Sequence, residues 1–425
     1  MRILVYPHDL NMGGSQLNAI ELAAAVRALG HDVIMFGQPG SLNLRIKELG
    51  LEFIAAPKPH HQPSRTIVRA LADVIRDRKI DIVHGYEWPP ALESRLAVDR
   101  SPGTAVVCTV MSMAVAPFIP KTMPLLVGTR EILDAEVAFG RASVELLEPP
   151  VDVKLNNPFL ELPLDDFRQR WNLNPDAYTV VLVTRLAQQL KLEGILTAIK
   201  AVGALAGELK IQLLLVGDGP ERDAVRAKAQ EINQLNGPGT IVLTGQLEDP
   251  RPAYLLADVA LGMGGSALRA MAFAKPLIVQ GEMGYWNLVT PETLPDFLEQ
   301  GWFGVGPGKY AGEARLVEIL RRLLPDDKQR TALGELGLRT VQDRFSLDRA
   351  ARLQEHFYRE ALRAPRRSSP VTDALAVRLL IKYQVAAHAK RLFGRLAADD
   401  FNARPVRART APRAKGSKTS PARML

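Results

Sequence analysis

The chain has 425 residues, 47% of them hydrophobic, which is enough for two domains with substantial cores. Cys108 is the only cysteine, which excludes an intrachain disulfide and a cysteine-rich metal site. Residues 366–425 carry 14 Lys and Arg against 3 Asp and Glu, and this excess of +11 outweighs the net charge of −3 on the first 365 residues. The body therefore has no electrostatic signature of nucleic-acid binding. Because the sequence has no signal-peptide pattern and no run of 18 apolar residues, we expect a cytoplasmic protein.

The first 162 residues alternate strand-like and helix-like patterns. Short apolar runs predict strands at 2–6, 32–37, 53–57, 80–86, 104–110 and 124–129. Helical periodicity predicts helices at 17–29, 64–78 and 90–98, the first ending at Gly30. Strands that alternate with helices favour a parallel sheet covered on both faces, so we expect a doubly wound α/β domain over 1–162.

The same alternation restarts after residue 162 and predicts a second doubly wound domain over 163–345. The predicted strands are 176–186, 210–219, 239–245, 257–265 and 275–282, and the predicted helices are 192–206, 220–232 and 266–274. A further long helix is expected within 346–365. In open parallel sheets ligands bind beyond the carboxyl ends of the strands, so two facing sheets would share one cleft.

The tetrapeptide Met-Gly-Gly-Ser occurs at 12–15 and again at 263–266, each time between a predicted strand and a predicted helix. Glycine permits close approach of a ligand, and the free N–H groups of a helix N-terminus attract an anion such as phosphate. The serine of each turn would cap its helix or bond the ligand. Plain helix caps remain the alternative. The candidate phosphate-binding residues are Gly13, Gly14, Ser15, Gly264, Gly265 and Ser266.

Six segments, in order, resemble the retaining glycosyltransferases of the GT-B fold in family 4. They lie at 13–33, 80–92, 183–195, 214–225, 241–261 and 269–279. The resemblance covers about residues 1–360 and implies two Rossmann-like domains facing across a cleft, with a crossover helix at 346–365. It also implies transfer of a sugar, with retention of configuration, from a nucleotide-diphosphate donor to a glycan, lipid or small-molecule acceptor. The nucleotide sugar is a substrate, and no cofactor or metal is expected.

Position by position, the resemblance assigns Gly13 and Gly14 to a loop near the donor diphosphate, and Arg185 and Lys191 to a pair of cations that bind it. Fixed cations suit this chemistry because the leaving diphosphate gains negative charge. Gly217 and Gly219 match a turn beside the donor, although a purely structural turn explains them almost as well.

The sequence departs from the family where two glutamates are usual, since Leu261 and Arg269 stand in their places. Arg269 has only donors and is expected to face phosphate instead. His84 matches a histidine often found in its segment, and Glu282 is the candidate replacement acceptor for sugar hydroxyls; both are predicted as catalytic. Because the glutamate pair is absent, a non-catalytic sugar-nucleotide-binding protein and a sugar-nucleotide epimerase remain alternatives.

The C-terminal 60 residues predict a basic amphipathic helix and a disordered tail. Leu375, Leu379, Leu392 and Leu396 recur at helical spacing beside Arg378/Lys382 and Arg391/Arg395. Peripheral contact of 371–397 with the inner face of a membrane is one interpretation, and docking on the protein itself is the other. From 404 onward the composition favours disorder.

Overall fold

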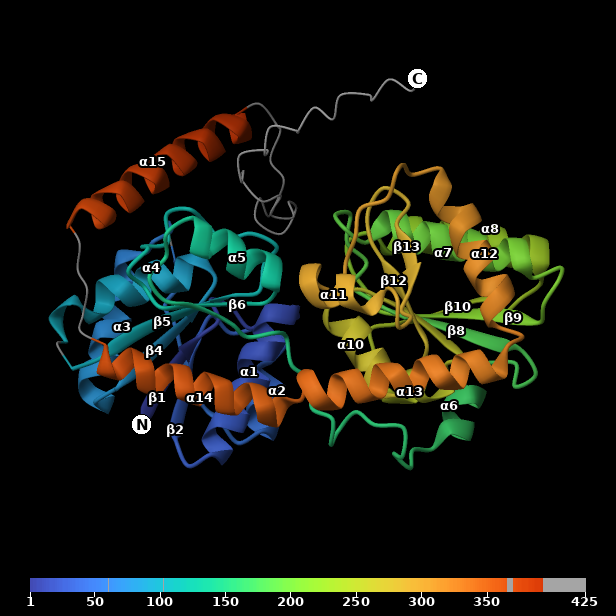
Figure 1. Ribbon diagram of the computed structural model, residues 1–425, viewed down its shortest axis with the longest axis horizontal. Coiled ribbons are helices and arrows are strands. Elements are labelled where there is room, and N and C mark those ends of the chain that lie inside the picture. The colour runs from blue at the N-terminus through green and yellow to red at the C-terminus, as the bar shows by residue number, and fades with distance from the viewer. Residues whose placement is uncertain (60, 102, 365–369, 393–425) are drawn as a thin grey trace, which may run out of the picture.

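The computed structural model describes residues 1–59, 61–101, 103–364 and 370–392 and shows two α/β domains side by side (Figure 1). The first domain is built on a seven-stranded sheet in the order β3-β2-β1-β4-β5-β6-β7, and all of its strand pairs are parallel. The strands are β1 (Arg2–Tyr6), β2 (Asp32–Gly37), β3 (Glu52–Ala55), β4 (Ile82–Tyr86), β5 (Ala105–Val110), β6 (Leu125–Val127) and β7 (Val144–Leu146).

Helices cover both faces of this sheet, because alternate side chains of each apolar strand enter different cores. Ile3 and Val5 of β1 pack with one face, whereas Leu4 and Tyr6 pack with the other. The helices are α1 (Gly14–Ala28), α2 (Asn43–Glu48), α3 (Arg65–Arg78), α4 (Trp88–Ala97), the 3₁₀ turn η1 (Val98–Arg100) and α5 (Arg130–Ala138). The arrangement is the doubly wound fold expected from the alternating pattern.

The second domain is built on a six-stranded sheet in the order β10-β9-β8-β11-β12-β13. Its strands are β8 (Tyr178–Val183), β9 (Ile211–Val216), β10 (Ile241–Gly245), β11 (Val259–Gly262), β12 (Leu277–Gln280) and β13 (Trp286–Leu288). The edge strand β13 runs antiparallel to β12, which the alternating pattern did not predict. The connection 281–285 is too short for a crossover, so the chain can only turn back beside β12.

Eight helices of the described chain belong to this domain: α6 (Leu164–Arg170), α7 (Leu192–Leu205), α8 (Arg222–Asn236), α9 (Arg251–Leu256), α10 (Gly265–Ala272), α11 (Leu294–Gln300), α12 (Ala311–Leu323) and α13 (Asp327–Arg344). α7, α8 and α12 pack on one face of the sheet, and α10 packs on the other. The two domains therefore share one construction principle, as expected of the GT-B fold.

The chain crosses between the domains at two adjacent points. The N–H of Val151 donates to the carbonyl of Phe345 at 2.8 Å, and the N–H of Leu347 donates to the carbonyl of Val151 at 2.9 Å. Helix α14 (Leu347–Arg363) then returns to the first domain, where Phe357 and Tyr358 enter its core (Figure 1). The two crossings and α14 join the domains into one molecule.

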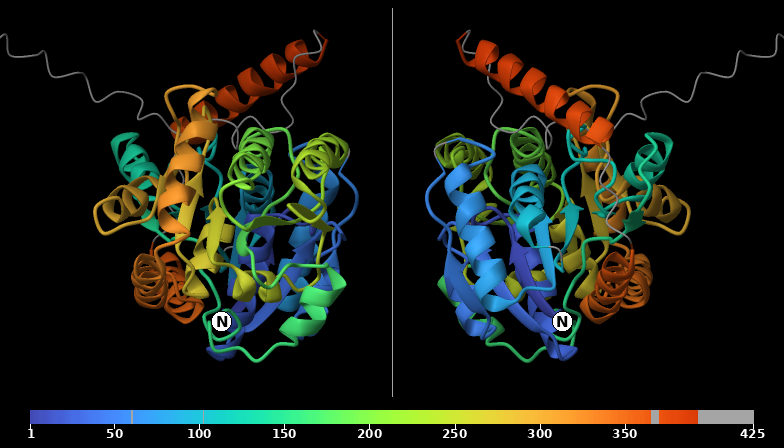
Figure 2. Two further views of the ribbon diagram at one scale, coloured as in Figure 1. Left: turned by 90° about the vertical axis from the view of Figure 1, so that its right-hand side faces the viewer. Right: turned by 90° about the vertical axis from the view of Figure 1, so that its left-hand side faces the viewer.

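Helix α15 (Pro370–Leu392) lies on the outside of the first domain above α4 (Figures 1 and 2). Leu379, Leu380 and Tyr383 pack against a cluster that includes Trp88 and Phe118. Of the predicted apolar positions, Leu379 packs on the protein, whereas Leu375, one turn before it, is 45% exposed. Within the described ranges, no helix is both long and apolar enough to cross a membrane. The predicted disordered tail, with Arg395 and Leu396, lies outside the described residues.

Candidate functional site

Each sheet has a point at which its strand order reverses, and the candidate donor residues gather there. In the first sheet this point lies between β1 and β4, and in the second it lies between β8 and β11. The turn at 13–15 follows β1, whereas the loop 184–191 follows β8 and the turn at 263–266 follows β11. Reversal points of parallel sheets are where ligands of such folds bind. The two identical tetrapeptides are therefore not topologically equivalent, but each one flanks a reversal point.

The two glycine turns differ in conformation. Gly13 is extended, with φ −160°, and precedes the first residue of α1, whereas Gly264 has φ +58°, which favours glycine. The N–H of Gly264 is taken by the carbonyl of Trp302 at 2.9 Å. The Ser266 hydroxyl bonds back to the N–H and the carbonyl of Met263, so it closes its own turn. Neither glycine turn has a side-chain cap on its helix.

Glu87, at the end of β4, ties together three loops of the first domain. Its carboxylate accepts hydrogen bonds from the Ser15 hydroxyl, the Met111 N–H, and both the N–H and the hydroxyl of Ser112. Burial raises the pKa of Glu87, and these four donors oppose that rise. Its backbone has φ +66° and ψ −179°, a conformation that costs about 1–3 kcal/mol in a residue other than glycine. Ser15 thus binds Glu87. The strained backbone of Glu87 is of a kind typical of functional sites.

The loop after β8 presents the two predicted cations. Lys191 is half-buried at the start of α7, and desolvation lowers the pKa of its amino group to about 8. Arg185 is exposed. Neither side chain forms an ion pair with any residue in the described part of the chain. Two unpaired cations beside a reversal point form a ready anion site.

Gly217 and Gly219 pack against this cation loop. A Cβ at Gly217 would overlap the carbonyl oxygen of Thr184, and one at Gly219 would overlap that of Leu186. The N–H of Gly217 donates to the Gly245 carbonyl at 2.9 Å, and that of Gly219 donates to the Asp218 carboxylate at 2.8 Å. In the structure the two glycines thus allow the backbone of this turn to approach the backbone of the cation loop closely. These glycines support the loop that carries Arg185.

Glu282 lies next to the same loop. Its carboxylate accepts a hydrogen bond from the backbone of Leu190, and its pKa is raised by burial and by the nearby Glu193. Glu193 itself accepts from the N–H of Gly284 at 2.7 Å. Because Leu190 precedes Lys191 in the chain, Glu282 contacts the loop that carries this predicted cation.

The two positions where the family usually has glutamates are occupied in different ways. Leu261 lies within β11 and is 1% exposed, so it belongs to the core. Arg269 lies in α10, and its guanidinium Nη2 is 3.6 Å from Oε1 of Glu21 in α1. Arg269 thus contacts a carboxylate of the first domain, a residue that the sequence analysis missed. The signal was present, because Glu21 is the only charged residue between Leu17 and Val26.

His84 is not part of this arrangement, which contradicts its predicted catalytic role. It lies inside β4 and is 0% exposed. Its Nδ1 is 2.7 Å from the Tyr358 hydroxyl, and its Nε2 is 2.6 Å from the Thr109 hydroxyl. Desolvation lowers the pKa of His84 to about 3, so the ring stays neutral. His84 instead anchors α14 to the first sheet.

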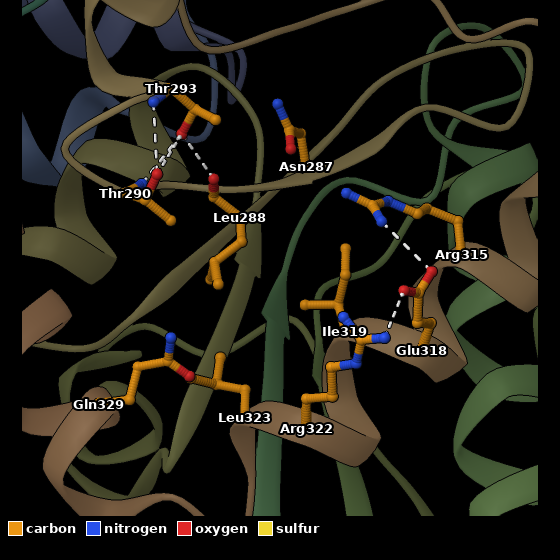
Figure 3. Close-up of a pocket in the computed structure, with 10 residues that line it drawn as sticks. All are labelled: Asn287, Leu288, Thr290, Thr293, Arg315, Glu318, Ile319, Arg322, Leu323 and Gln329. Carbon is orange, nitrogen blue, oxygen red and sulfur yellow. Dashed lines mark hydrogen bonds and ion pairs between the residues drawn. The ribbon is translucent and has the colours of Figure 1, made fainter.

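A cavity of about 260 Å³ opens elsewhere in the second domain, between β13 and α12 (Figure 3). Arg315 and Arg322, which both line it, share the single carboxylate of Glu318. None of the predicted site residues lines this cavity. The candidate site is therefore defined by the loops at the reversal points.

Two family models match the two domains separately. Residues 13–135 match the glycosyl transferase 4-like domain, and residues 177–301 match glycosyl transferases group 1. The first match begins at Gly13 and includes Glu21 and Glu87; the second includes both cations and Arg269. The matched regions thus contain the residues that the structure gathers at both reversal points.

Known proteins resemble the whole arrangement. The chain is 25% identical to a GDP-mannose-dependent monoacylated alpha-(1-6)-phosphatidylinositol monomannoside mannosyltransferase from Corynebacterium glutamicum, over 71% of this chain and 82% of that protein. A glycosyltransferase from Rickettsia africae shares the fold with a TM-score of 0.68 and 16% identity, over 86% of this chain and 99% of that one. HepE of Anabaena, solved with UDP, has a TM-score of 0.65 and 14% identity, over 85% of this chain and all of that one. The two matches and the mannosyltransferase support a family 4-like glycosyltransferase, and the solved structures show that the chain has the GT-B fold.

Proposed function

We propose that the chain transfers a sugar from a nucleotide-diphosphate donor to an acceptor hydroxyl with retention of anomeric configuration. The observation that carries this proposal is Lys191, a desolvated ammonium group whose pKa is lowered to about 8 and which pairs with no acidic side chain of the described residues. A desolvated cation costs free energy unless an anion arrives, and a diphosphate supplies that anion. The UDP bound to HepE, a protein of the same fold, supports this class of ligand.

The proposed reaction needs positioned charge more than a dedicated base. The bond between the sugar C1 and the donor phosphate oxygen breaks, and C1 bonds to the acceptor oxygen on the same face. The acceptor proton passes to the departing phosphate, and the nucleoside diphosphate leaves. Arg185 and Lys191 would stabilise the charge that develops on that leaving group. Glu282 is proposed to accept sugar hydroxyls, and neither a metal nor a separate cofactor is required.

A panel of donors tests the proposal directly. We expect UDP-glucose, GDP-mannose or ADP-glucose to raise the melting temperature of the purified chain, since a ligand at 100 times its Kd adds about 2.7 kcal/mol of stability. Release of nucleoside diphosphate with a suitable acceptor then reports transfer. Conversion of the donor into an isomer without any acceptor would indicate an epimerase instead. If no nucleotide sugar stabilises the chain, the proposal is wrong.

A non-catalytic nucleotide-sugar-binding protein is the second candidate. It is favoured by the absence of carboxylates at both family positions, with Leu261 buried in the core and Arg269 engaged with Glu21. The same panel separates the two functions, because this candidate binds donor without releasing nucleoside diphosphate in the presence of any acceptor.

We also propose that α15 lies on an anionic membrane surface. Val377, Ile381 and Val385 stand at spacing i, i+4, i+8 and are 56%, 55% and 64% exposed. They form an apolar stripe next to the exposed Arg378 and Lys382, the combination that favours an interface rich in anionic lipid. The related mannosyltransferase has a phosphatidylinositol-based acceptor by name, which suits an enzyme that works at such a surface.

Vesicle binding checks this second proposal. We expect the full chain to sediment with vesicles that contain phosphatidylglycerol and not with pure phosphatidylcholine. Replacing Ile381 and Val385 by serine should weaken vesicle binding at least about tenfold. The membrane would bury the apolar surface of these two side chains, and that burial supplies much of the affinity. Leu235→Ser is a matched control, since Leu235 is 74% exposed on a helix of the other domain. If the Ile381 and Val385 serine variant binds the phosphatidylglycerol vesicles as well as Leu235→Ser does, the proposal is wrong.

A further inference from the structure

The ion pair between Glu21 and Arg269 joins the middle of α1 in the first domain to the middle of α10 in the second domain. Helical side chains lean toward the N-terminus of their helix, so Glu21 leans from the middle of α1 over the turn that holds Leu17 and Asn18. Arg269 leans back along α10 in the same way, and its Nη1 would lie 3.8 Å from a Cβ at Gly265. Arg269 therefore lies next to the glycine turn at 263–266, and through it Glu21 of the first domain is tied to that turn.

Glu21 is only half satisfied by this ion pair. Its side chain is buried, with the residue 9% exposed, and Oε1 faces Arg269 at 3.6 Å. Its Oε2 is buried without a hydrogen-bond partner among the residues that the structure describes. Leaving a buried acceptor unsatisfied costs about 1–3 kcal/mol, and more when it is charged. A group that donates a hydrogen bond to Oε2 would remove this cost.

We infer that Glu21 is a donor-recognition residue whose free Oε2 accepts a hydrogen bond from a hydroxyl of the bound nucleotide sugar. In this arrangement Arg269 pairs with Oε1 and orients the carboxylate. The first domain then supplies a hydrogen-bond acceptor, Oε2 of Glu21, to a ligand whose diphosphate binds the second domain. Hydroxyl groups are the fitting donors, because they are abundant on both the ribose and the transferred sugar. The inference rests on the proposed function, since it needs a nucleotide sugar at this site.

The main alternative is that the ion pair only holds the two domains together. A purely mechanical link makes no distinction among ligands that occupy the same site. A hydroxyl acceptor, in contrast, distinguishes ligands that carry hydroxyl groups from those that carry phosphate alone. Comparison of such ligands therefore separates the two roles.

The test measures binding of UDP-glucose, GDP-mannose, UDP, GDP and inorganic pyrophosphate to the full chain by calorimetry. We expect Glu21→Gln to weaken the preferred nucleotide sugar about tenfold and to leave pyrophosphate unchanged within about twofold. If the free nucleoside diphosphate loses as much affinity as the nucleotide sugar, the contact is to ribose. If only the nucleotide sugar loses affinity, the contact is to the transferred sugar. Glu208→Gln is the matched control, because Glu208 forms an exposed pair with Arg321 within the second domain.

Two results would overturn the inference. The first is an equal loss of affinity for all five ligands, which a mechanical link explains. The second is that Glu21→Gln has unchanged affinity for every ligand that the unmodified chain binds. That result would leave the proposed function intact and contradict only the role of Glu21 in donor recognition. If the unmodified chain binds pyrophosphate but no nucleotide, the proposed function fails together with the inference.

Discussion

Lys191→Met is expected to lower turnover about 100-fold while leaving the protein folded. Removing one preorganised charge from a developing oxyanion typically costs a factor of this size. The variant should be at least as stable as the unmodified chain, since methionine fills a similar volume without a desolvated charge. Lys200→Met is the matched control, because Lys200 is exposed in the same helix, α7. Steady-state release of nucleoside diphosphate, with melting temperatures alongside, measures both effects.

The lowered pKa of Lys191 adds a pH dependence of definite sign. The group is charged below pH 8 and loses its proton as the pH rises through about 8. Affinity for a nucleotide sugar, whose diphosphate does not titrate in this range, should therefore fall up to tenfold per pH unit above 8. Lys191→Arg should remove this dependence, because guanidinium stays charged. A flat profile for the unmodified chain would show that Lys191 does not bind the diphosphate.

The architecture was readable from the sequence because buried parallel strands leave a strong signal. Continuous apolar runs such as 3–6 and 213–216 have no amphipathic alternation, since both faces of each strand are covered. The edge strand β13 left no comparable signal, because three residues are too few to show a pattern. The orientation of α15 was equally hidden, since apolar side chains occur on both its packed and its exposed sides.

The site was only partly predictable, because a residue type does not reveal which way its side chain points. His84 and Glu87 are three residues apart at the end of one strand, yet the first anchors a core helix and the second joins the loops at the reversal point. Glu21 was missed for a related reason. Its partner, Arg269, lies 248 positions later, and only the packing of the two domains brings them to 3.6 Å.

Gly217→Ala separates the structural and ligand-binding explanations of the second-domain glycines, and it is expected to destabilise the protein by about 3 kcal/mol. The added Cβ would overlap the Thr184 carbonyl, and the backbone at φ +144° is one that alanine rarely adopts. For a domain of this size the loss corresponds to a fall of about 6–12 °C in melting temperature. Gly207→Ala is the control, since its Cβ would meet nothing within 4 Å. Relief of the overlap must move Thr184 and its neighbour Arg185, so nucleotide-sugar affinity should fall even well below the melting temperature. A variant that keeps its melting temperature but loses donor binding would instead mean that Gly217 faces the nucleotide, because only a ligand would then occupy the space that the Cβ needs.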